Sequence, residues 1–331
     1  MAAALNLEED IFNVEHKSFE SVALQVFRYQ YEHVPVYHFF CNGIKRNPEN
    51  THTLDQIPFL PIRFFKSHDV MATGKQPAVV FSSSGTTGSI TSKHRVASAT
   101  IYEESFTRCF EQFYGPIADY CILALLPNYL ERSGSSLVYM AENMIAKTTA
   151  NGSGFFLYDF EKLKATLQTN ETAGRKTLLL GVTYALLDFA EYFQAELKHT
   201  IIMETGGMKG KREEMTRGEV HRELMQSFST KAIHSEYGMT ELLSQGYSAG
   251  NGIFQNPQWM KIMLRDTYDP LSVSAQAGSG AINIIDLANL YSCSFIATDD
   301  AGKLYNDGSF EVLGRLDAAE VRGCNLMYDA I

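Results

Sequence analysis

A run of serine, threonine and glycine residues stands at Ser82–Gly88, with the sequence SSSGTTG. It directly follows the apolar run Ala78–Phe81, which predicts a short buried strand. Hydroxyl and backbone N–H groups in such a loop can surround a polyphosphate, and glycines let the backbone approach closely. The Gly-Lys-Ser/Thr ending of a Walker loop is absent. A polar surface linker explains the composition equally well.

A second glycine segment, Thr205–Arg212, reads TGGMKGKR and follows the apolar run His199–Glu204. Gly206 and Gly207 permit a tight backbone path beside a flat ring, and the basic residues can contact an anion. Taken alone, a strand-to-helix turn with solvated lysines is the better interpretation.

The third segment, His234–Glu241, reads HSEYGMTE. A tyrosine before a glycine, as at Tyr237 and Gly238, can lay its ring against a base. The hydroxyl of Thr240 can contact a phosphate, and the carboxylate of Glu241 can hold Mg²⁺. A loop with a packed tyrosine is the competing interpretation.

The fourth segment combines TDDAG at Thr298–Gly302 with DGSFEVLGRLD at Asp307–Asp317. An aspartate can accept two ribose hydroxyls, and an arginine can reach a ribose or a phosphate. Asp-Gly also marks a hairpin turn, so two ordinary hairpins explain this segment when it stands alone.

Alternating strand and helix patterns position the first three segments. Strands are predicted at Ala78–Phe81, Tyr120–Pro127, Gly154–Tyr158, Thr177–Val182, His199–Glu204 and Lys231–His234. Helices are predicted at Ser98–Tyr114, Ser135–Lys147, Phe160–Gln168, Tyr184–Leu197 and Arg212–Phe228. This alternation predicts an α/β fold with a mostly parallel sheet covered by helices. After Gly250, short strands between turns predict a smaller β-rich subdomain.

Composition limits the class of protein. Hydrophobic residues make up 45% and charged residues 20% of the 331 residues, which is typical of a soluble globular protein of two domains or subdomains. The net charge of -10 argues against nucleic acid as the main partner. The N-terminus has no secretory pattern, and no apolar stretch is long enough to span a membrane.

Cysteine usage points to a reducing compartment. The five cysteines are Cys41, Cys109, Cys121, Cys293 and Cys324. Their number is odd and no pair shows CxxC spacing, which argues against a disulfide framework or a zinc site. We therefore expect reduced thiols and a cytoplasmic location.

In this order, the four segments resemble the adenylate-forming superfamily of acyl-CoA synthetases, luciferases and peptide-synthetase adenylation domains. SSSGTTG matches its phosphate signature, EYGMTE its adenine-and-magnesium motif, and TDDAG…GRLD its TGD…GRxD run. Within that superfamily the chain most closely resembles LuxE-type acyl-protein synthetases, which feed fatty acids to the reductase of bacterial bioluminescence. The residues that carry this resemblance are SSSGTTG, Pro127–Met140, Glu204–Glu214 and Val321–Tyr328.

The resemblance implies the large domain of that superfamily, with a small β-rich C-terminal subdomain and no full lid domain. We expect residues 1–250 to form an α/β nucleotide- and acyl-binding core, and residues 251–331 to complete the ATP site. The lid of longer members carries a catalytic lysine that this sequence does not reach. Asn128–Gly134, after a predicted strand, is expected to line the acyl pocket, although a strand-to-helix connection is an equal alternative.

The resemblance also implies a site for ATP and Mg²⁺. The β- and γ-phosphates would be held by Ser83, Ser84, Gly85, Thr86 and Thr87. The adenine slot would be formed by Gly206, Gly207, Tyr237 and Gly238. The α-phosphate, Mg²⁺, ribose and GRxD positions match Thr240, Glu241, Asp300 and Arg315. Two departures stand out: Lys93 lies farther from the loop than the family's basic residue, and Asp299 replaces a glycine.

The implied reaction begins with attack of a substrate carboxylate on the α-phosphate of MgATP. Pyrophosphate leaves, an acyl-adenylate forms, and a thiol then takes the acyl group. In LuxE-type proteins a C-terminal cysteine carries the acyl group, and Cys324, beside Arg322, matches that position. A small buried cysteine in a terminal strand is the alternative. The other four cysteines lie in apolar patterns and are expected in the core.

Two other functions remain open at this point. In the expected reaction the acyl group goes to a protein thiol, on Cys324 or on an acyl-accepting reductase or carrier protein. One alternative is an acyl-CoA ligase, in which coenzyme A is the acyl acceptor. The other is a non-catalytic nucleotide- or acyl-binding protein. The intact segment Tyr237–Glu241 argues against the second, because Glu241 matters only where magnesium chemistry persists.

Overall fold

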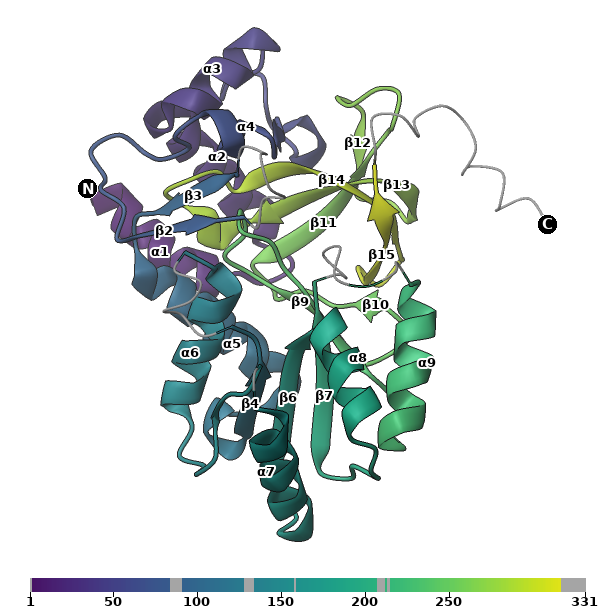
Figure 1. Ribbon diagram of the computed structural model, residues 1–331. Coiled ribbons are helices and arrows are strands. Elements are labelled where there is room, and N and C mark those ends of the chain that lie inside the picture. Colours follow the sequence, from purple (N-terminus) through teal and green to yellow (C-terminus); the bar gives the residue numbers. More distant parts are fainter. Residues whose placement is uncertain are drawn as a thin grey trace, which may run out of the picture. The chain divides into compact units, whose positions relative to one another are not determined.

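The computed structural model describes residues 2–83, 91–127, 134–157, 159–206, 212 and 215–316, the side chains of residues 2–6 excepted. The chain divides into two compact units (Figure 1). Unit 1 contains Met1–Ala78, His94–Ala97 and Gln258–Ile331, and unit 2 contains Val79–Lys93 and Ser98–Pro257. None of the helices described is long and apolar enough to cross a membrane.

Unit 2 is built on a sheet with the strand order β5-β4-β6-β7-β8-β9. Its strands are β4 (Cys121–Leu125), β5 (Gly154–Phe155), β6 (Thr177–Val182), β7 (Thr200–Thr205), β8 (His234–Tyr237) and β9 (Gly246–Ser248). Strands β5, β4, β6, β7 and β8 are parallel, and β9 is antiparallel to β8. Every residue of β4 and β6 is buried, as expected for central strands covered on both faces.

Helices accompany this sheet in the predicted alternation (Figure 1). They are α5 (Ala99–Tyr114), α6 (Ser136–Lys147), α7 (Phe160–Thr172), α8 (Thr183–Tyr192) and α9 (Arg217–Phe228). Unit 2 also contains the short helix η2 (Ile117–Asp119) and the short strand β10 (Ile253–Phe254). Helices α5 and α6 begin after the capping serines Ser98 and Ser135. Helix α9 begins later than predicted, because Thr216 and Glu219 form a capping box.

Unit 1 is built on an antiparallel sheet that runs β15-β14-β13-β11-β12. Its strands are β11 (Met260–Arg265), β12 (Val273–Ser274), β13 (Gly278–Asp286), β14 (Phe295–Leu304) and β15 (Phe310–Arg315). The short helix η3 (Leu287–Asn289) lies in the connection between β13 and β14. Strand β1 (Leu60–Pro61) adds to β14 in parallel, with Leu60 opposite Ile296. The predicted β-rich C-terminal region is therefore present.

The N-terminal helices also belong to unit 1, and the sequence patterns do not predict this grouping. They are α1 (Ala2–Phe12), α2 (Phe19–His33), α3 (Pro35–Gly43), η1 (Leu54–Gln56) and α4 (Phe64–Ser67). The first 78 residues are grouped with the C-terminal sheet in one compact unit. The pairing of β1 with β14 gives the physical reason.

Two short strands, β2 (Val79–Ser82) and β3 (Lys93–Val96), precede and follow the Ser/Thr/Gly loop in the sequence. The predicted strand Ala78–Phe81 therefore lies within one residue of β2. The strand predicted at Lys231–His234 lies three residues later, so that Glu236 and Tyr237 are inside β8.

Candidate nucleotide site

The ends of two neighbouring strands bring the second and third motifs together. Strands β7 and β8 are parallel, and Thr205 is the register partner of Glu236. Because parallel strands end at the same edge of a sheet, Gly206 and Tyr237 lie at one edge of unit 2. The Tyr237 ring is buried and lies 5.9 Å, centroid to centroid, from the ring of Phe254.

The turn after β7 accepts a hydrogen bond from the hydroxyl of Thr183. Gly206 has a φ of 71°, a left-handed conformation that favours glycine. Its carbonyl accepts a hydrogen bond of 3.1 Å from Thr183 Oγ1, and the same hydroxyl lies 3.2 Å from Glu204 Oε2. The first residue of α8 thus holds the start of the predicted adenine loop.

Glu204 is a buried carboxylate that sequence reasoning did not single out. Its Oε1 lies 3.6 Å from Arg217 Nε and 3.6 Å from His221 Nε2, both on α9. The same His221 nitrogen lies 3.3 Å from Ser235 Oγ, on β8. Burial of a carboxylate is costly without such partners. The available signal was an acidic residue at the end of an otherwise apolar strand.

A second buried carboxylate, Glu236, lies on the opposite face of the sheet, since side chains alternate along a strand. Thr205 donates a hydrogen bond to its Oε2. A Cβ atom on Gly238 would lie 2.4 Å from its Oε1. A side chain at position 238 would therefore require this carboxylate to move.

Thr240 and Glu241 lie in the turn that follows β8, which Leu242 N–H closes with a 3.1 Å bond to the Met239 carbonyl. The Glu241 side chain is buried. Within the described part of the chain, no three His, Cys, Asp or Glu side chains are grouped to hold a metal ion. A single carboxylate still fits Mg²⁺, which takes most of its ligands from phosphate and water.

The base of the Ser/Thr/Gly loop is closed by backbone and hydroxyl contacts. Ser83 N–H donates to the Ser92 carbonyl at 3.1 Å, and Ser92 N–H donates to Ser83 Oγ at 3.0 Å. Ser82 N–H donates to the Gly134 carbonyl at 2.7 Å. Six predicted site residues lie outside the described residues. They are the loop residues Ser84, Gly85, Thr86 and Thr87, the predicted adenine contact Gly207, and the predicted acyl carrier Cys324.

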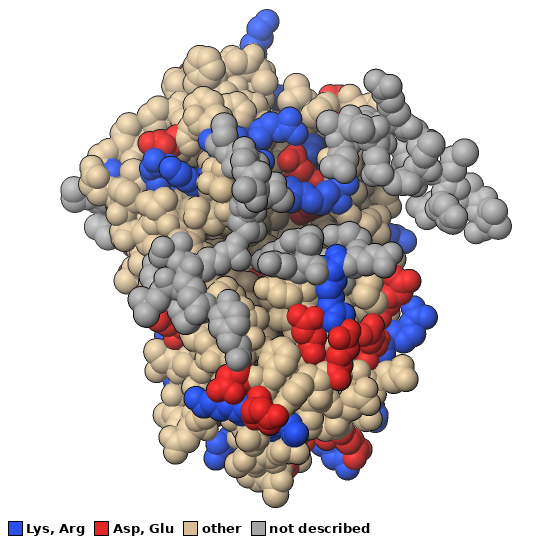
Figure 2. Space-filling view, viewed as in Figure 1, with Lys and Arg blue, Asp and Glu red and all other residues tan. Residues whose placement is uncertain are grey.

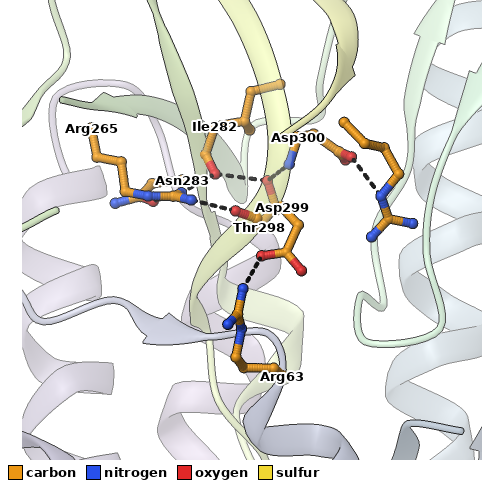
Figure 3. A network of polar contacts seen from close by, with 8 residues as sticks. Arg63, Arg265, Ile282, Asn283, Thr298, Asp299 and Asp300 are labelled. Carbon is orange, nitrogen blue, oxygen red and sulfur yellow. Dashed lines mark hydrogen bonds and ion pairs between the residues drawn. The ribbon is translucent and has the colours of Figure 1, made fainter. Parts of the chain in front are cut away.

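In unit 1, the fourth motif lies on β14 and β15, where Asp300 and Arg315 are register partners. Arg315 Nε lies 3.9 Å from Asp300 Oδ1 (Figure 3). Asp299, the residue that replaces the family's glycine, has a different partner: its Oδ1 lies 3.4 Å from a terminal nitrogen of Arg63. The two neighbouring aspartates therefore meet different cations.

The sequence matches the family described as Acyl-protein synthetase, LuxE, over residues 5–330. The chain belongs to the LuxE acyl-protein synthetase family. No curated protein matches the sequence.

Solved structures of adenylate-forming enzymes resemble this LuxE-family fold. ATP-bound MatB from Rhodopseudomonas palustris has 17% identity and a TM-score of 0.52, and the match covers 71% of this chain and 47% of MatB. An ATP-bound RpMatB–BxBclM chimera has 17% identity and a TM-score of 0.54, with coverages of 74% and 49%. MenE from Bacillus subtilis, in complex with AMP, has 19% identity and a TM-score of 0.50, with coverages of 75% and 64%.

These likenesses show the fold. The predicted fold class, the large domain of adenylate-forming enzymes, is confirmed. The chain spans about half the length of MatB and of its chimera. Fold alone does not assign an activity, so the activity, substrate and partners of this chain are treated below as proposals.

The described cysteines of this LuxE-family chain lie in the core, as predicted. Cys41, Cys109, Cys121 and Cys293 are buried thiols that take part in no disulfide. Burial raises the pKa of the Cys41 thiol to about 12 and also raises that of Cys293. Cys109 Sγ donates to the Gln245 carbonyl at 3.2 Å. Cys41 and Cys293 are therefore poor nucleophiles at neutral pH, because the thiolate is the reactive form.

Two basic residues that follow the predicted glycine-containing segments in the sequence, Arg212 and Arg95, are paired with carboxylates. Arg212 Nε donates to Asp188 Oδ1 at 2.8 Å, and a terminal nitrogen donates to Glu191 Oε1 at 2.7 Å. Acidic and basic side chains lie next to one another on the lower half of the face in Figure 2. Arg95, in unit 1, lies 2.7 Å from Asp69.

Proposed function

We propose that this chain activates a carboxylic acid with ATP and passes the acyl group to a thiol. The observation that carries this proposal is the edge of unit 2 where Gly206 and Tyr237 end neighbouring parallel strands. Two buried carboxylates, Glu204 and Glu236, hold that edge from opposite faces of the sheet. Membership of the LuxE family supports adenylation as its chemistry.

In the first half-reaction, a carboxylate oxygen of the acid attacks the α-phosphorus of ATP. The bond from that phosphorus to the bridging oxygen breaks, and pyrophosphate leaves with its electron pair. We assign the adenine to Gly206, Gly207, Tyr237 and Gly238, and the α-phosphate to the Thr240 hydroxyl. Glu241 would hold Mg²⁺, which neutralises phosphate charge when bound.

We assign the outer phosphates to Ser83, Ser84, Gly85, Thr86 and Thr87. The hydroxyl of Ser83 accepts from Ser92 N–H, so it is held in place and its own proton remains available for donation. Binding of this kind stabilises the developing charge by preorganised donors.

In the second half-reaction, a thiolate attacks the acyl carbonyl and AMP leaves. We propose Cys324 as that thiol. Burial of Cys41, Cys109, Cys121 and Cys293 supports this choice, because it leaves one cysteine of the sequence for the role. The absence of a disulfide among the described cysteines also fits a reducing compartment such as the cytoplasm. A reductase or carrier protein would receive the acyl group next.

We propose a fatty acid as the substrate, in line with the family. The segment expected to line its pocket, Asn128–Gly134, lies outside the described residues except for Gly134. The choice of acid therefore rests on a substrate panel.

The first test is carboxylate-dependent exchange between pyrophosphate and ATP across acids of increasing chain length. We expect exchange with the wild type and a loss of at least about a hundredfold in Glu241→Ala, because one preorganised charge contact contributes roughly that much. Glu142→Ala, at an exposed position of α6, is the matched control and should retain wild-type exchange. Nucleotide binding without exchange for any acid would support a binding protein instead.

The second test is mass spectrometry of the protein after incubation with ATP and the preferred acid. We expect an acyl adduct on the wild type, released by hydroxylamine, and no adduct on Cys324→Ser. Cys121→Ser is the control and should keep the adduct. Survival of the adduct in Cys324→Ser would remove this residue from the mechanism, and turnover that requires coenzyme A would favour the ligase alternative.

A further inference from the structure

One guanidinium, that of Arg265 at the end of β11, ties three strands of unit 1 together. One terminal nitrogen lies 2.8 Å from Asn283 Oδ1 and 3.0 Å from the Ile282 carbonyl, both on β13. The other terminal nitrogen lies 2.5 Å from the Thr298 carbonyl, on β14. Figure 3 shows these contacts directly beside the two aspartates of the fourth motif.

The strand that carries those aspartates is irregular at this point. Ala281 pairs with Ala301, and Asn283 pairs with Ala297, with a register shift between the two pairs. Ile282 of β13 therefore stands opposite the three residues Thr298–Asp300. Such a bulge leaves ladder groups without strand partners and re-aims the side chains that it carries.

Side chains replace the missing ladder bonds. Thr298 Oγ1 donates to the Ile282 carbonyl at 2.8 Å, and Asp300 N–H donates to Thr298 Oγ1 at 3.2 Å. The Ile282 carbonyl thus receives both Arg265 and Thr298. A continuous set of contacts runs from Arg265 to the backbone of Asp300, so the guanidinium fixes the position from which the Asp300 side chain projects.

The two aspartates differ in the cations that lie closest to them. Burial lowers the pKa of the Arg265 guanidinium, and the nearby charges of Asp299 and Asp300 oppose that shift. Asp299 is held by Arg63. The Asp300 side chain is 15% exposed and lies 3.9 Å from the mostly exposed Arg315.

We propose that Arg265 is a positioning residue of the ribose site. It holds the bulge at Thr298–Asp300 so that the Asp300 carboxylate accepts the ribose hydroxyls, while Arg63 retains Asp299. This inference rests on the proposed function, because it assumes a bound ATP.

The test is the ratio of dissociation constants for 2′-deoxyATP and ATP, measured by titration calorimetry on the full chain without turnover. A hydrogen bond to a charged group changes affinity by roughly tenfold to a hundredfold. We expect the wild type to prefer ATP by that factor and Asp300→Asn to lose the preference. Arg265→Met should reduce the ratio to below about threefold.

Matched variants separate positioning from folding. Thr298→Val removes the hydroxyl that links Ile282 to Asp300 and should also lower the ratio, whereas Thr298→Ser should restore it. Arg63→Met removes the ion pair to Asp299 but none of the hydrogen bonds made by Arg265, and should leave the ratio unchanged. Circular dichroism checks that each variant is folded, and the threonine pair decides the test should Arg265→Met fail to fold.

Three results would overturn the inference: equal binding of the two nucleotides by the wild type, loss of preference in Asp299→Asn but not in Asp300→Asn, or an unchanged ratio in the folded Arg265→Met and Thr298→Val variants. Pyrophosphate exchange remains a separate measurement. Discrimination between nucleotides without exchange would reject the proposed activity and leave the ribose assignment standing.

Discussion

Glu236 links two parts of the candidate site at the scale of single residues. Its carboxylate accepts from Thr205 at the end of β7, and it also occupies the space next to Gly238. The side chain is buried, so it cannot swing into solvent to make room without losing the Thr205 bond. One carboxylate therefore fixes the spacing between the second and third motifs.

This packing predicts the effect of a methyl group at position 238. Gly238→Ala should lower the free energy of unfolding by roughly 1–3 kcal/mol, the usual cost of overpacking, and should weaken ATP binding. Gly218→Ala is the control, because a Cβ at that position in α9 meets nothing within 4 Å. The control should be neutral or slightly stabilising, since alanine is the better helix former. Urea unfolding and nucleotide titration measure both effects, and equal stability of the two variants would contradict the packing argument.

Two of the residues that support the site could not be read from the sequence. Thr183 and Glu204 lie far apart along the chain, and their contact arises only when β6 and β7 pair and α8 begins directly after β6. Gly206 and Tyr237, by contrast, are predicted from their motifs, and the βα alternation predicts the parallel strands whose ends they follow, whereas the pairing of β7 with β8 comes from the structure.

At the scale of elements, apolar strands were predictable and a polar one was not. The prediction Thr177–Val182 coincides with β6, because its run of apolar residues is buried on both faces. Strand β8 was placed three residues too early. Its residues Ser235 and Glu236 are polar but buried, and side-chain hydrogen bonds, rather than apolar character, allow them to lie in a central sheet.

At the scale of the whole molecule, unit 1 combines segments that lie far apart in the sequence, residues 2–78 and 258–316. Local patterns predict the short C-terminal strands, but periodicity contains no information about which distant element they pack on. The pairing of Leu60 with Ile296 depends on contacts more than two hundred residues apart in sequence. The grouping of residues 1–78 with residues 258–331 was therefore beyond sequence reasoning.

Gln30 offers a test of the contact between helix α2 and residues 289–294 of unit 1. The side chain is fully buried on α2, and its Nε2 lies 3.0 Å from each of the Asn289 carbonyl, the Leu290 carbonyl and Ser294 Oγ. Its Oε1 accepts from Ser294 N–H at 3.0 Å. One amide thus satisfies several buried groups in the connection between β13 and β14.

Gln30→Leu keeps the approximate volume but leaves those groups without the amide, which costs about 1–3 kcal/mol for each unsatisfied polar group that water cannot reach. We expect a loss of roughly 2–4 kcal/mol in urea unfolding, together with earlier proteolytic cleavage within α1–α3. Gln168→Leu, the same change at an exposed position of α7, should stay within about 0.5 kcal/mol of the wild type. Matching stabilities of the two variants, or unchanged cleavage of the N-terminal helices, would mean that apolar packing alone joins the N-terminal helices to the sheet.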